Sequence, residues 1–156
     1  MVNVIALGNI LRGDDGIGPL VLKRLQAHPA AKEMNLVDAG SDAFLILEYL
    51  NGTNANIVVD CANMGLSPGS VRRFRMDSDI LSEVDAMISL HGFSFAEIYK
   101  MAENLGPIAP VTLIGIQPET LEFGQKLSPM VERAIPQILD LIIKEAQYYA
   151  KENFDH

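Results

Sequence analysis

The sequence predicts an α/β sandwich, because buried strand patterns alternate with helical patterns along its 156 residues. The strand patterns are apolar and β-branched and lack the alternation of a strand with one wet face, which is typical of parallel strands covered on both sides. They lie at residues 2–7, 57–59 and 111–116, with Leu36 and Val37 in a fourth strand. The helical patterns lie at residues 18–27, 43–50, 93–105 and about 128–150. This alternation predicts a parallel sheet with helices on its faces.

The last helical pattern carries an apolar stripe. Its members follow helical spacing and are Val131, Ile135, Ile138, Ile142, Ala146 and Tyr149. We expect this face to cover the sheet, although the same pattern would also suit a membrane or partner surface. Pro136 lacks a backbone N–H, so it is expected either to kink the helix or to start it afresh.

Length and charge narrow the class of protein. The chain fits one domain, residues 1–156, and its net charge of −8 would repel the phosphate backbone of a nucleic acid. The N-terminal residues lack the basic region of a signal peptide, and no run approaches the ~20 apolar residues of a spanning helix. We therefore expect a cytoplasmic protein without membrane insertion. Its single cysteine, Cys61, agrees with a reducing compartment.

The only cluster of basic residues lies in one short segment. A turn at Ser67-Pro68-Gly69 leads to a predicted strand at residues 70–75, which contains Arg72, Arg73 and Arg75. The simplest interpretation is a solvated edge strand, whose charges prevent pairing with another chain.

The first strand ends in a glycine-rich turn, residues 8–18, that leads into a helix. Such turns often bind phosphate, but the dinucleotide pattern requires glycine where this chain has Ile10, and the P-loop pattern requires Lys-Ser/Thr where it has Asp14-Asp15. Two carboxylates at the start of a helix would repel a phosphate. They either attract a cation or cap the free N–H groups of the helix, and for each residue alone the two interpretations are equally good.

Two further polar residues follow predicted elements. Asp60 comes directly after the strand at residues 57–59, so it should lie at the carboxyl end of a central strand, beside the glycine-rich turn. His91 precedes a helix, where a histidine is equally well a turn residue bonded to backbone. Together Asp15, Asp60 and His91 would suit nickel or zinc better than magnesium, because imidazole is a poor ligand for hard cations. Three ligands would leave positions open for water or substrate.

Cys61 offers an alternative nucleophile, since a thiolate activated by His91 could cleave an amide. Neighbours on a strand face opposite sides, however, so Cys61 should point away from Asp60 into the core. The sequence contains neither a Gly-x-Ser-x-Gly elbow nor a His-Glu-x-x-His helix, which argues against the common serine and zinc peptidases.

The segments around these residues resemble the hydrogenase maturation protease family. The glycine-rich turn matches the family's opening signature of Gly-Asn, a short spacer and Asp-Asp/Glu-x-x-Gly. Further matches follow in order: Asp38-Ala39-Gly40-Ser41, Val58-Val59-Asp60-Cys61-Ala62, Ser89-Leu90-His91-Gly92, Gly115-Ile116-Gln117-Pro118-Glu119 and Leu127-Ser128-Pro129. The resemblance covers about residues 3–140 and is closest to the formate-hydrogenlyase hydrogenase 3 type and its archaeal relatives. Two departures are Asp15, where some members have Glu, and Ala39, where glycine is usual.

This resemblance implies a three-layer α/β/α sandwich of the phosphorylase/hydrolase-like kind, around a twisted, mostly parallel five-stranded sheet. It implies that Asp15, Asp60 and His91 meet nickel, and that Asp38 is a nearby acid used in recognition or cleavage. In this family nickel is understood to arrive with the substrate, so the free protease is expected to carry no metal. Nickel itself, or a carboxylate of Asp15, Asp38 or Asp60, would activate the attacking water.

The function implied is that of an aspartic-type, nickel-dependent endopeptidase. It would remove the C-terminal extension of a nickel-loaded [NiFe]-hydrogenase large-subunit precursor and act as a monomer. One alternative is a nickel-dependent checkpoint chaperone that binds the precursor without hydrolysis, and another is a small-molecule α/β hydrolase with a metabolite pocket. The arginine cluster at residues 72–75 would then either help to select the precursor tail or remain a solvated edge.

Overall fold

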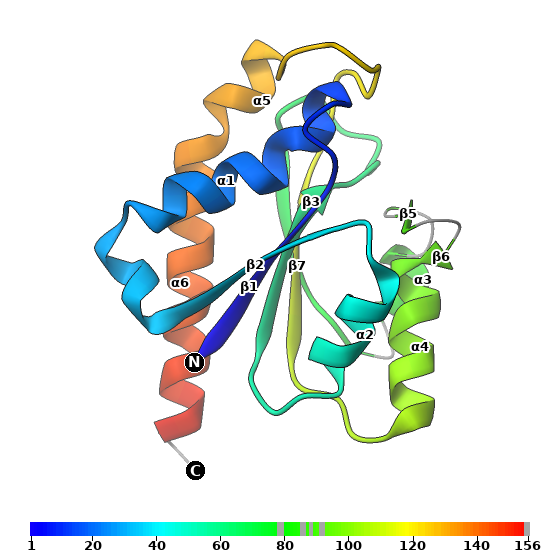
Figure 1. Cartoon of the computed structure of the whole chain (residues 1–156), viewed down its shortest axis with the longest axis vertical. Helices are drawn as coiled ribbons and strands as arrows, with labels where there is room; N and C mark the ends of the chain where they lie inside the picture. The colour runs from blue at the N-terminus through cyan, green and yellow to red at the C-terminus, as the bar shows by residue number, and fades with distance from the viewer. Residues whose placement is uncertain (78–79, 85–86, 88, 91–92, 155–156) are drawn as a thin grey trace.

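A computed structural model of the chain describes residues 1–77, 80–84, 87, 89–90 and 93–154. Helices lie on both faces of a twisted sheet, which gives three layers (Figure 1). His91, one of the predicted nickel ligands, lies outside the described residues. No helix in the described ranges is long and apolar enough to cross a bilayer.

The sheet has five strands in the order β2-β1-β3-β7-β4. Four strands are parallel, namely β1 (Val2–Leu7), β2 (Met34–Gly40), β3 (Asn56–Cys61) and β7 (Val111–Ile116). The edge strand β4 (Val71–Arg75) runs antiparallel to β7. The mostly parallel five-stranded sheet that the resemblance implied is therefore confirmed. A small separate hairpin pairs β5 (Ser89–Leu90) with β6 (Phe93–Ser94).

The helices divide between the two faces of the sheet. On one face lie α1 (Ile17–Gln26), α5 (Pro129–Arg133) and α6 (Ile135–Phe154), and on the other lie α2 (Ala43–Leu50), α3 (Leu81–Val84) and α4 (Phe95–Leu105) (Figure 1). Short 3-10 turns η1 (Gly13–Gly16) and η2 (Pro29–Glu33) precede α1 and β2. Each face is thus covered along its length, as a sheet of buried parallel strands requires.

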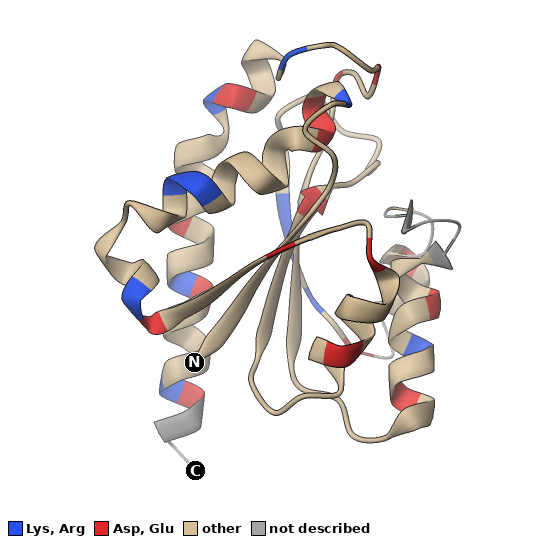
Figure 2. Ribbon diagram, viewed as in Figure 1, with Lys and Arg blue, Asp and Glu red and all other residues tan. Residues whose placement is uncertain are grey.

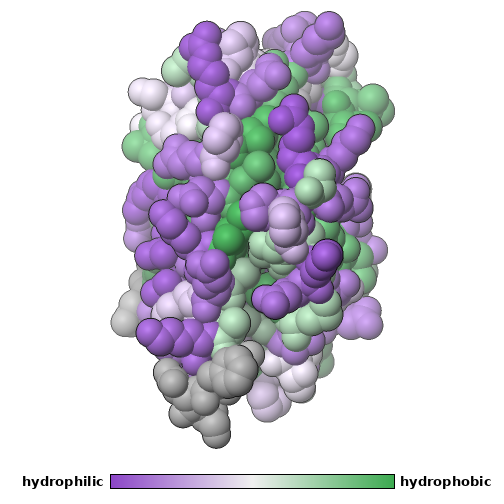
Figure 3. Space-filling view, turned by 90° about the vertical axis from the view of Figure 1, so that its left-hand side faces the viewer, coloured by the Kyte–Doolittle hydropathy of each residue, from purple (hydrophilic) through white to green (hydrophobic). Residues whose placement is uncertain are grey.

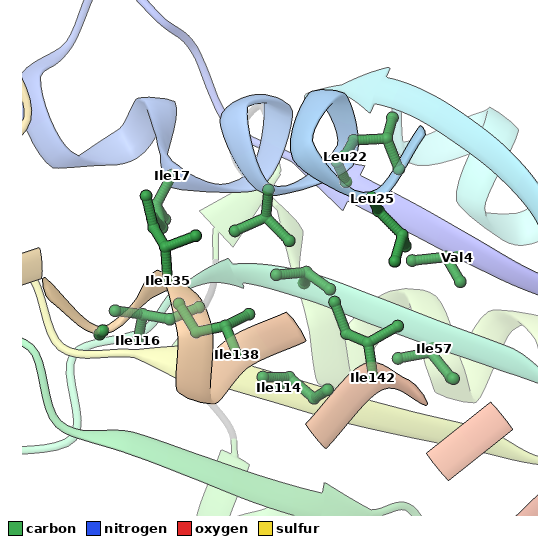
Figure 4. Packing of buried hydrophobic residues seen from close by; sticks show 14 of the residues in the cluster. Val4, Ile17, Leu22, Leu25, Ile57, Ile114, Ile116, Ile135, Ile138 and Ile142 are labelled. Atoms are coloured by element: carbon green, nitrogen blue, oxygen red, sulfur yellow. The ribbon is translucent and has the colours of Figure 1, made fainter. Parts of the chain in front are cut away.

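Alternate residues of each central strand pack into two separate hydrophobic cores, one on each face of the sheet. In β1, Val4 and Ala6 pack toward α1 and α6, whereas Ile5 and Leu7 pack toward α2 and α4. The first of these cores is an apolar layer formed by helices α1, α5 and α6 and strands β1, β2, β3 and β7, and Figure 4 shows part of it. From outside, an apolar stripe runs between hydrophilic surfaces on the side of the molecule formed by α1 and α6 (Figure 3).

The last helix behaves as the sequence predicts. The apolar stripe packs against the sheet, with Ile138 and Ile142 fully buried. The helix is interrupted at Ala134, and Pro136 lies in the first turn of the new helix α6, where its missing N–H costs no hydrogen bond. Pro136 therefore starts a helix afresh.

Two predicted features of strand β4 have different outcomes. It is an edge strand, as expected, but its arginines are not simply solvated. Arg75 Nε lies 2.8 Å from Glu145 Oε1 and Arg73 Nη1 lies 3.1 Å from Glu145 Oε2. Glu145 belongs to α6 and is only 1% exposed, so the arginines fasten the edge strand to the last helix. Figure 2 shows how both charge signs alternate along α6.

Where strands β2, β1 and β3 begin, a row of hydrogen-bonded asparagine side chains connects them. Asn35 donates to Asn3 (3.0 Å), Asn3 donates to Asn56 (2.9 Å), and Asn56 donates to the carbonyl of Tyr49 (3.2 Å). Asn3 and Asn56 are buried, so a slip of one residue would leave their amides without partners. These hydrogen bonds fix the register of β2, β1 and β3.

Candidate functional site

The candidate site lies at the carboxyl edge of the sheet, where strands β1 and β3 are neighbours. The helices that follow β1 and β2 cover opposite faces of the sheet, so the chain winds in different directions from this point. Open α/β sheets place functional groups at such a switch point. The loop after β1 and the end of β3 both carry acidic residues here (Figure 2).

The loop after β1 folds back tightly on itself. Gly8 has a φ of +116°, and a Cβ on it would lie 2.1 Å from the carbonyl oxygen of Asp15. A Cβ on Gly18 would lie 2.3 Å from the carbonyl oxygen of Leu7. Neither position has room for a side chain, so these glycines are required to bring the loop and the start of α1 against the sheet.

Asp15 is held by the loop and remains partly accessible, with a side chain that is 16% exposed. Its Oδ2 accepts the backbone N–H of Asn9 at 2.8 Å, and Arg12 Nη1 lies 4.0 Å from the same oxygen. The N-cap of α1 is Gly16 and receives no side-chain hydrogen bond. Asp15 therefore does not cap this helix, and its other oxygen, Oδ1, points at the space beside Gly8.

Asp60 lies at the carboxyl end of strand β3, one residue before the last, as predicted, and is only 6% exposed. Its Oδ1 accepts the backbone N–H of Cys61 at 2.8 Å. Burial raises the pKa of Asp60 well above its usual value of 3.8, and the negative charge of Asp15 raises the pKa further. The N–H of Cys61 and the charge of Arg12 lower the pKa of Asp60, but their effects are weaker. Asp15 is thus close enough for its charge to act on Asp60.

Asp14 has a structural role that the sequence interpretation missed, since it neither caps α1 nor faces a cation. It is fully buried, and its carboxylate accepts hydrogen bonds from the backbone N–H groups of Glu119, Thr120 and Ser128 and from the Ser128 hydroxyl, at 2.7–3.1 Å. Burial by itself would raise the pKa of Asp14, but these donors lower it. Asp14 therefore fastens the site loop to the segment after β7.

A second polar side chain orders the loop after β3. Gln117, the residue directly after β7, accepts the N–H groups of Met64 (2.7 Å) and Leu66 (3.3 Å) through its Oε1. Its side chain is nearly buried. In the sequence, the Gln-Pro and Ser-Pro segments stand out only by their resemblance to the family. Their partners lie 51 to 114 residues away in the chain, so local patterns contained no sign of these contacts.

Cys61 and Asp38 differ from Asp60 in their surroundings. Cys61 faces the core beside α1, as predicted, and its thiol donates to the carbonyl of Asp14 at 2.8 Å. Burial, followed by the charges of three aspartates, raises the pKa of this thiol, which disfavours a thiolate nucleophile.

Asp38 is exposed near the end of β2, where it accepts the N–H of Gly40 at 3.3 Å. Asp38 is not among the charges that shift the pKa of Asp60.

The two departures from the family pattern are compatible with this geometry. The short side chain of Asp15 reaches the loop N–H of Asn9. In the segment that contains Ala39, Gly40 has a φ of +57°, while Ala39 itself is buried against the core. The register of β1 and β2 shifts here, which lets Gly8 donate to the carbonyl of Gly40 at 2.9 Å.

The described residues bring two acidic side chains together at this edge, Asp15 and Asp60, and no complete metal site. No group of three His, Cys, Asp or Glu side chains able to hold a metal occurs within the described ranges, which exclude His91. Two neighbouring carboxylates, one of them nearly buried, offer oxygen ligands for a cation or a pair that can hold and release a proton. A large cavity of about 520 Å³ lies at the opposite edge, between η2 and α6.

Comparisons with known proteins agree on one family. The family model described as hydrogenase maturation protease matches residues 19–145. The hydrogenase expression/formation protein HupD of Rhodobacter capsulatus is 30% identical over 97% of this chain and 73% of its own length. The hydrogenase 3 maturation protease of Escherichia coli is 27% identical over 86% of this chain and 84% of its own.

Solved structures give the same answer. The hydrogenase maturating endopeptidase HybD from E. coli superposes with a TM-score of 0.80 at 25% identity, covering 94% of this chain and 92% of its own. The [NiFe] hydrogenase maturation protease HybD from Thermococcus kodakarensis superposes with a TM-score of 0.71 at 27% identity, covering 93% and 98%. Because the family model, the curated relatives and the solved structures agree, the chain belongs to the hydrogenase maturation protease family.

Proposed function

We propose that this protein is an endopeptidase that removes the C-terminal extension of a nickel-loaded [NiFe]-hydrogenase large-subunit precursor. The observation that carries the proposal is the pairing of Asp60, almost fully buried, with Asp15 at the carboxyl edge of the sheet in a member of this family. Two like charges held together in a poorly solvated place are unfavourable unless a cation or a proton joins them. A metal-loaded substrate would supply that cation.

In this proposal the nickel belongs to the substrate and the chain contributes ligands. Carboxylate oxygens of Asp15 and Asp60, together with the predicted ligand His91, would occupy open coordination positions on the nickel. This contact would hold the scissile peptide at the carboxyl edge of the sheet by proximity and orientation. Precursors without nickel would lack the contact, so cleavage would follow metal insertion.

Water is the proposed nucleophile. The thiol of Cys61 is buried and donates to a backbone carbonyl, which makes it a poor candidate. A carboxylate at this edge would act as general base, with Asp15 more accessible than Asp60 and Asp38 exposed on the neighbouring strand. A cytoplasmic location and a monomeric state remain parts of the proposal.

The direct test uses nickel-loaded and nickel-free forms of the same precursor, followed by mass spectrometry of the large subunit. We expect loss of a C-terminal peptide only from the nickel-loaded form. The Asp60→Asn variant should leave that precursor intact. The Asp140→Asn variant is the matched control, because Asp140 is 62% exposed on α6 and pairs with Lys144 instead of the site.

The same experiment separates the rival functions. A checkpoint chaperone would bind the nickel-loaded precursor and release it at full length. A small-molecule hydrolase would ignore both precursors, and the apolar cavity between η2 and α6 would be its natural substrate pocket. Full processing by the Asp60→Asn variant would overturn the proposed role of the paired carboxylates.

A further inference from the structure

Exposed apolar side chains gather around the candidate site. Most of the exposed large hydrophobic residues in the described ranges lie in loops or first helical turns at the carboxyl edge of the sheet: Ile10, Leu11, Phe44, Leu66, Leu121, Phe123 and Met130. Leu11 is 62% exposed and Phe123 is 70% exposed. Single exposed hydrophobic residues are ordinary, but a cluster at one edge usually marks an interaction surface.

Four of these residues lie on two loops that are hydrogen-bonded to each other. Gly124 donates to the carbonyl of Leu11 at 2.9 Å, and the N–H of Asp14 donates to the carbonyl of Thr120 at 2.9 Å. These bonds join the loop after β1 to the loop after β7. We call the exposed side chains of the two loops the apolar rim, which consists of Ile10, Leu11, Leu121 and Phe123.

The apolar rim is continuous with the paired carboxylates. The guanidinium of Arg12 lies 5.6 Å from the centre of the Phe123 ring and 4.0 Å from the carboxylate of Asp15. One side chain therefore contacts both the rim and the site. The rim therefore lies next to Asp15, where a macromolecule bound at the site would meet it.

We propose that the apolar rim is the docking surface for the folded body of the hydrogenase precursor. This inference rests on the proposed function, because the same loops hold the groups that the scissile segment must reach. The partner would present an apolar surface around the root of its C-terminal extension, and burying the rim against it would supply binding that does not depend on nickel. Nickel would then decide cleavage, whereas the rim would decide affinity.

A second copy of this chain is the competing occupant. The wild-type chain and the rim variant described below should both run as monomers in size-exclusion chromatography at micromolar concentration. If the wild-type chain ran as a dimer and the rim variant as a monomer, the proposal would be overturned, because the rim would then be an interface between copies.

The decisive experiment compares two double variants in binding. Leu11→Ser/Leu121→Ser removes rim residues that are 62% and 39% exposed. Met101→Ser/Leu105→Ser is the matched control on α4, with residues that are 37% and 69% exposed away from the site. Both are made in an Asp60→Asn background, so that cleavage does not disturb the measurement, and binding of immobilised precursor is followed by interferometry. Thermal unfolding of each variant checks the fold.

We expect the rim variant to raise the dissociation constant at least about tenfold, the size of a modest interface contribution. The control variant should bind within twofold of its parent. Three outcomes would each overturn the docking proposal. The rim variant could bind as tightly as its parent, the control variant could lose as much affinity as the rim variant, or the parent could fail to bind. Separate assays of the wild-type chain test cleavage. If the wild-type chain cleaves the precursor but the rim variant binds as well as its parent, the proposed function holds and the docking proposal fails. If binding depends on the rim but the wild-type chain does not cleave the precursor, the docking proposal holds and the proposed function fails.

Discussion

Two carboxylates of this protein are almost equally buried, and their surroundings are opposite. Asp60 is 6% exposed and lies beside another acid, whereas Glu145 is 1% exposed and lies beside two arginines. Burial raises the pKa of Asp60 and the charge of Asp15 raises it further. Burial would also raise the pKa of Glu145, but hydrogen bonds from Arg75 and Thr112 and the arginine charges bring it below its usual value.

The contrast separates a structural acid from a functional one. Glu145 is satisfied within the chain, because Thr112 donates to it at 3.0 Å in addition to the arginines, and Thr112 also contacts the hydroxyl of Tyr149. Within the described residues, no cation lies at ion-pair distance from Asp60. A buried charge that the fold leaves uncompensated is unfavourable, and it persists where a site requires it.

The largest expected effect is the loss of activity on substitution of Asp60, the functional acid of this comparison. Asp60→Asn should lower the rate of precursor processing by about 10²-fold to 10⁴-fold, the range over which a positioned acid or base contributes. Glu145→Gln should lower processing far less, because its side chain belongs to the interface of α6 with β4 and β7. Initial rates of the mass shift measure both variants. Similar losses in the two would abolish the distinction.

The next largest effect is a loss of stability when the structural acid, Glu145, loses a compensating charge. Arg75→Gln should lower the free energy of unfolding by about 1–3 kcal/mol, because it leaves the buried Glu145 carboxylate with less compensating charge. Arg72→Gln is the control, since Arg72 pairs with Glu83, whose side chain is 51% exposed, and such surface pairs contribute at most about 1 kcal/mol. Urea unfolding curves measure both. Equal losses would mean that burial of the acid does not matter.

The dependence of stability on pH should have opposite signs for the two acids. The folded pKa of Glu145 lies below its usual 4.5, so its contribution is present above that pH and is lost as the pH falls through the folded pKa. The folded pKa of Asp60 lies above its usual 3.8, so ionisation costs stability as the pH rises toward the folded value. Relative to wild type, Glu145→Gln should lose stability and Asp60→Asn should gain it as the pH rises from acid to neutral, in thermal unfolding curves.

The smallest effect sharpens the comparison with a third buried acid. Ser128→Ala removes the hydroxyl donor to Asp14 and keeps the backbone donor, so it should cost about 0.5–1.5 kcal/mol. Processing should fall little, because the other donors to Asp14 still hold the loop. Ser67→Ala is a control on an exposed turn. Loss of processing without loss of stability in Ser128→Ala would assign the hydroxyl to the site itself.

Local patterns predicted most of the fold and the ends of several elements. Strands β1 and β7 and helix α2 have the predicted bounds, because apolar periodicity and turn residues act over a few positions. The placement of Asp60 at the end of β3 followed from the same reasoning. The short hairpin of β5 and β6 and the helix α3 were not predicted, since segments this short lack a readable period.

The partners of buried acids were harder to predict, although one signal was available. Glu145 follows Ile138 and Ile142 and precedes Tyr149 at helical spacing, so an acid interrupts the apolar stripe of α6. Such an acid requires a cation, and the arginines of β4 were the natural candidates. The contacts of Asp14 offered no such signal, because its donors lie more than 100 residues along the chain.

The bonds between Asp14 and Ser128 also set the order in which the enzyme becomes competent during synthesis. A ribosome makes the loop that bears Asp15 early, but the donors that hold the neighbouring Asp14 are made 105 to 114 residues later. Until Ser128 leaves the exit tunnel, the nascent chain has both acidic residues and no fixed geometry between them. The loop that bears Asp15 therefore reaches its final geometry only after residue 128 has been made and has joined the fold.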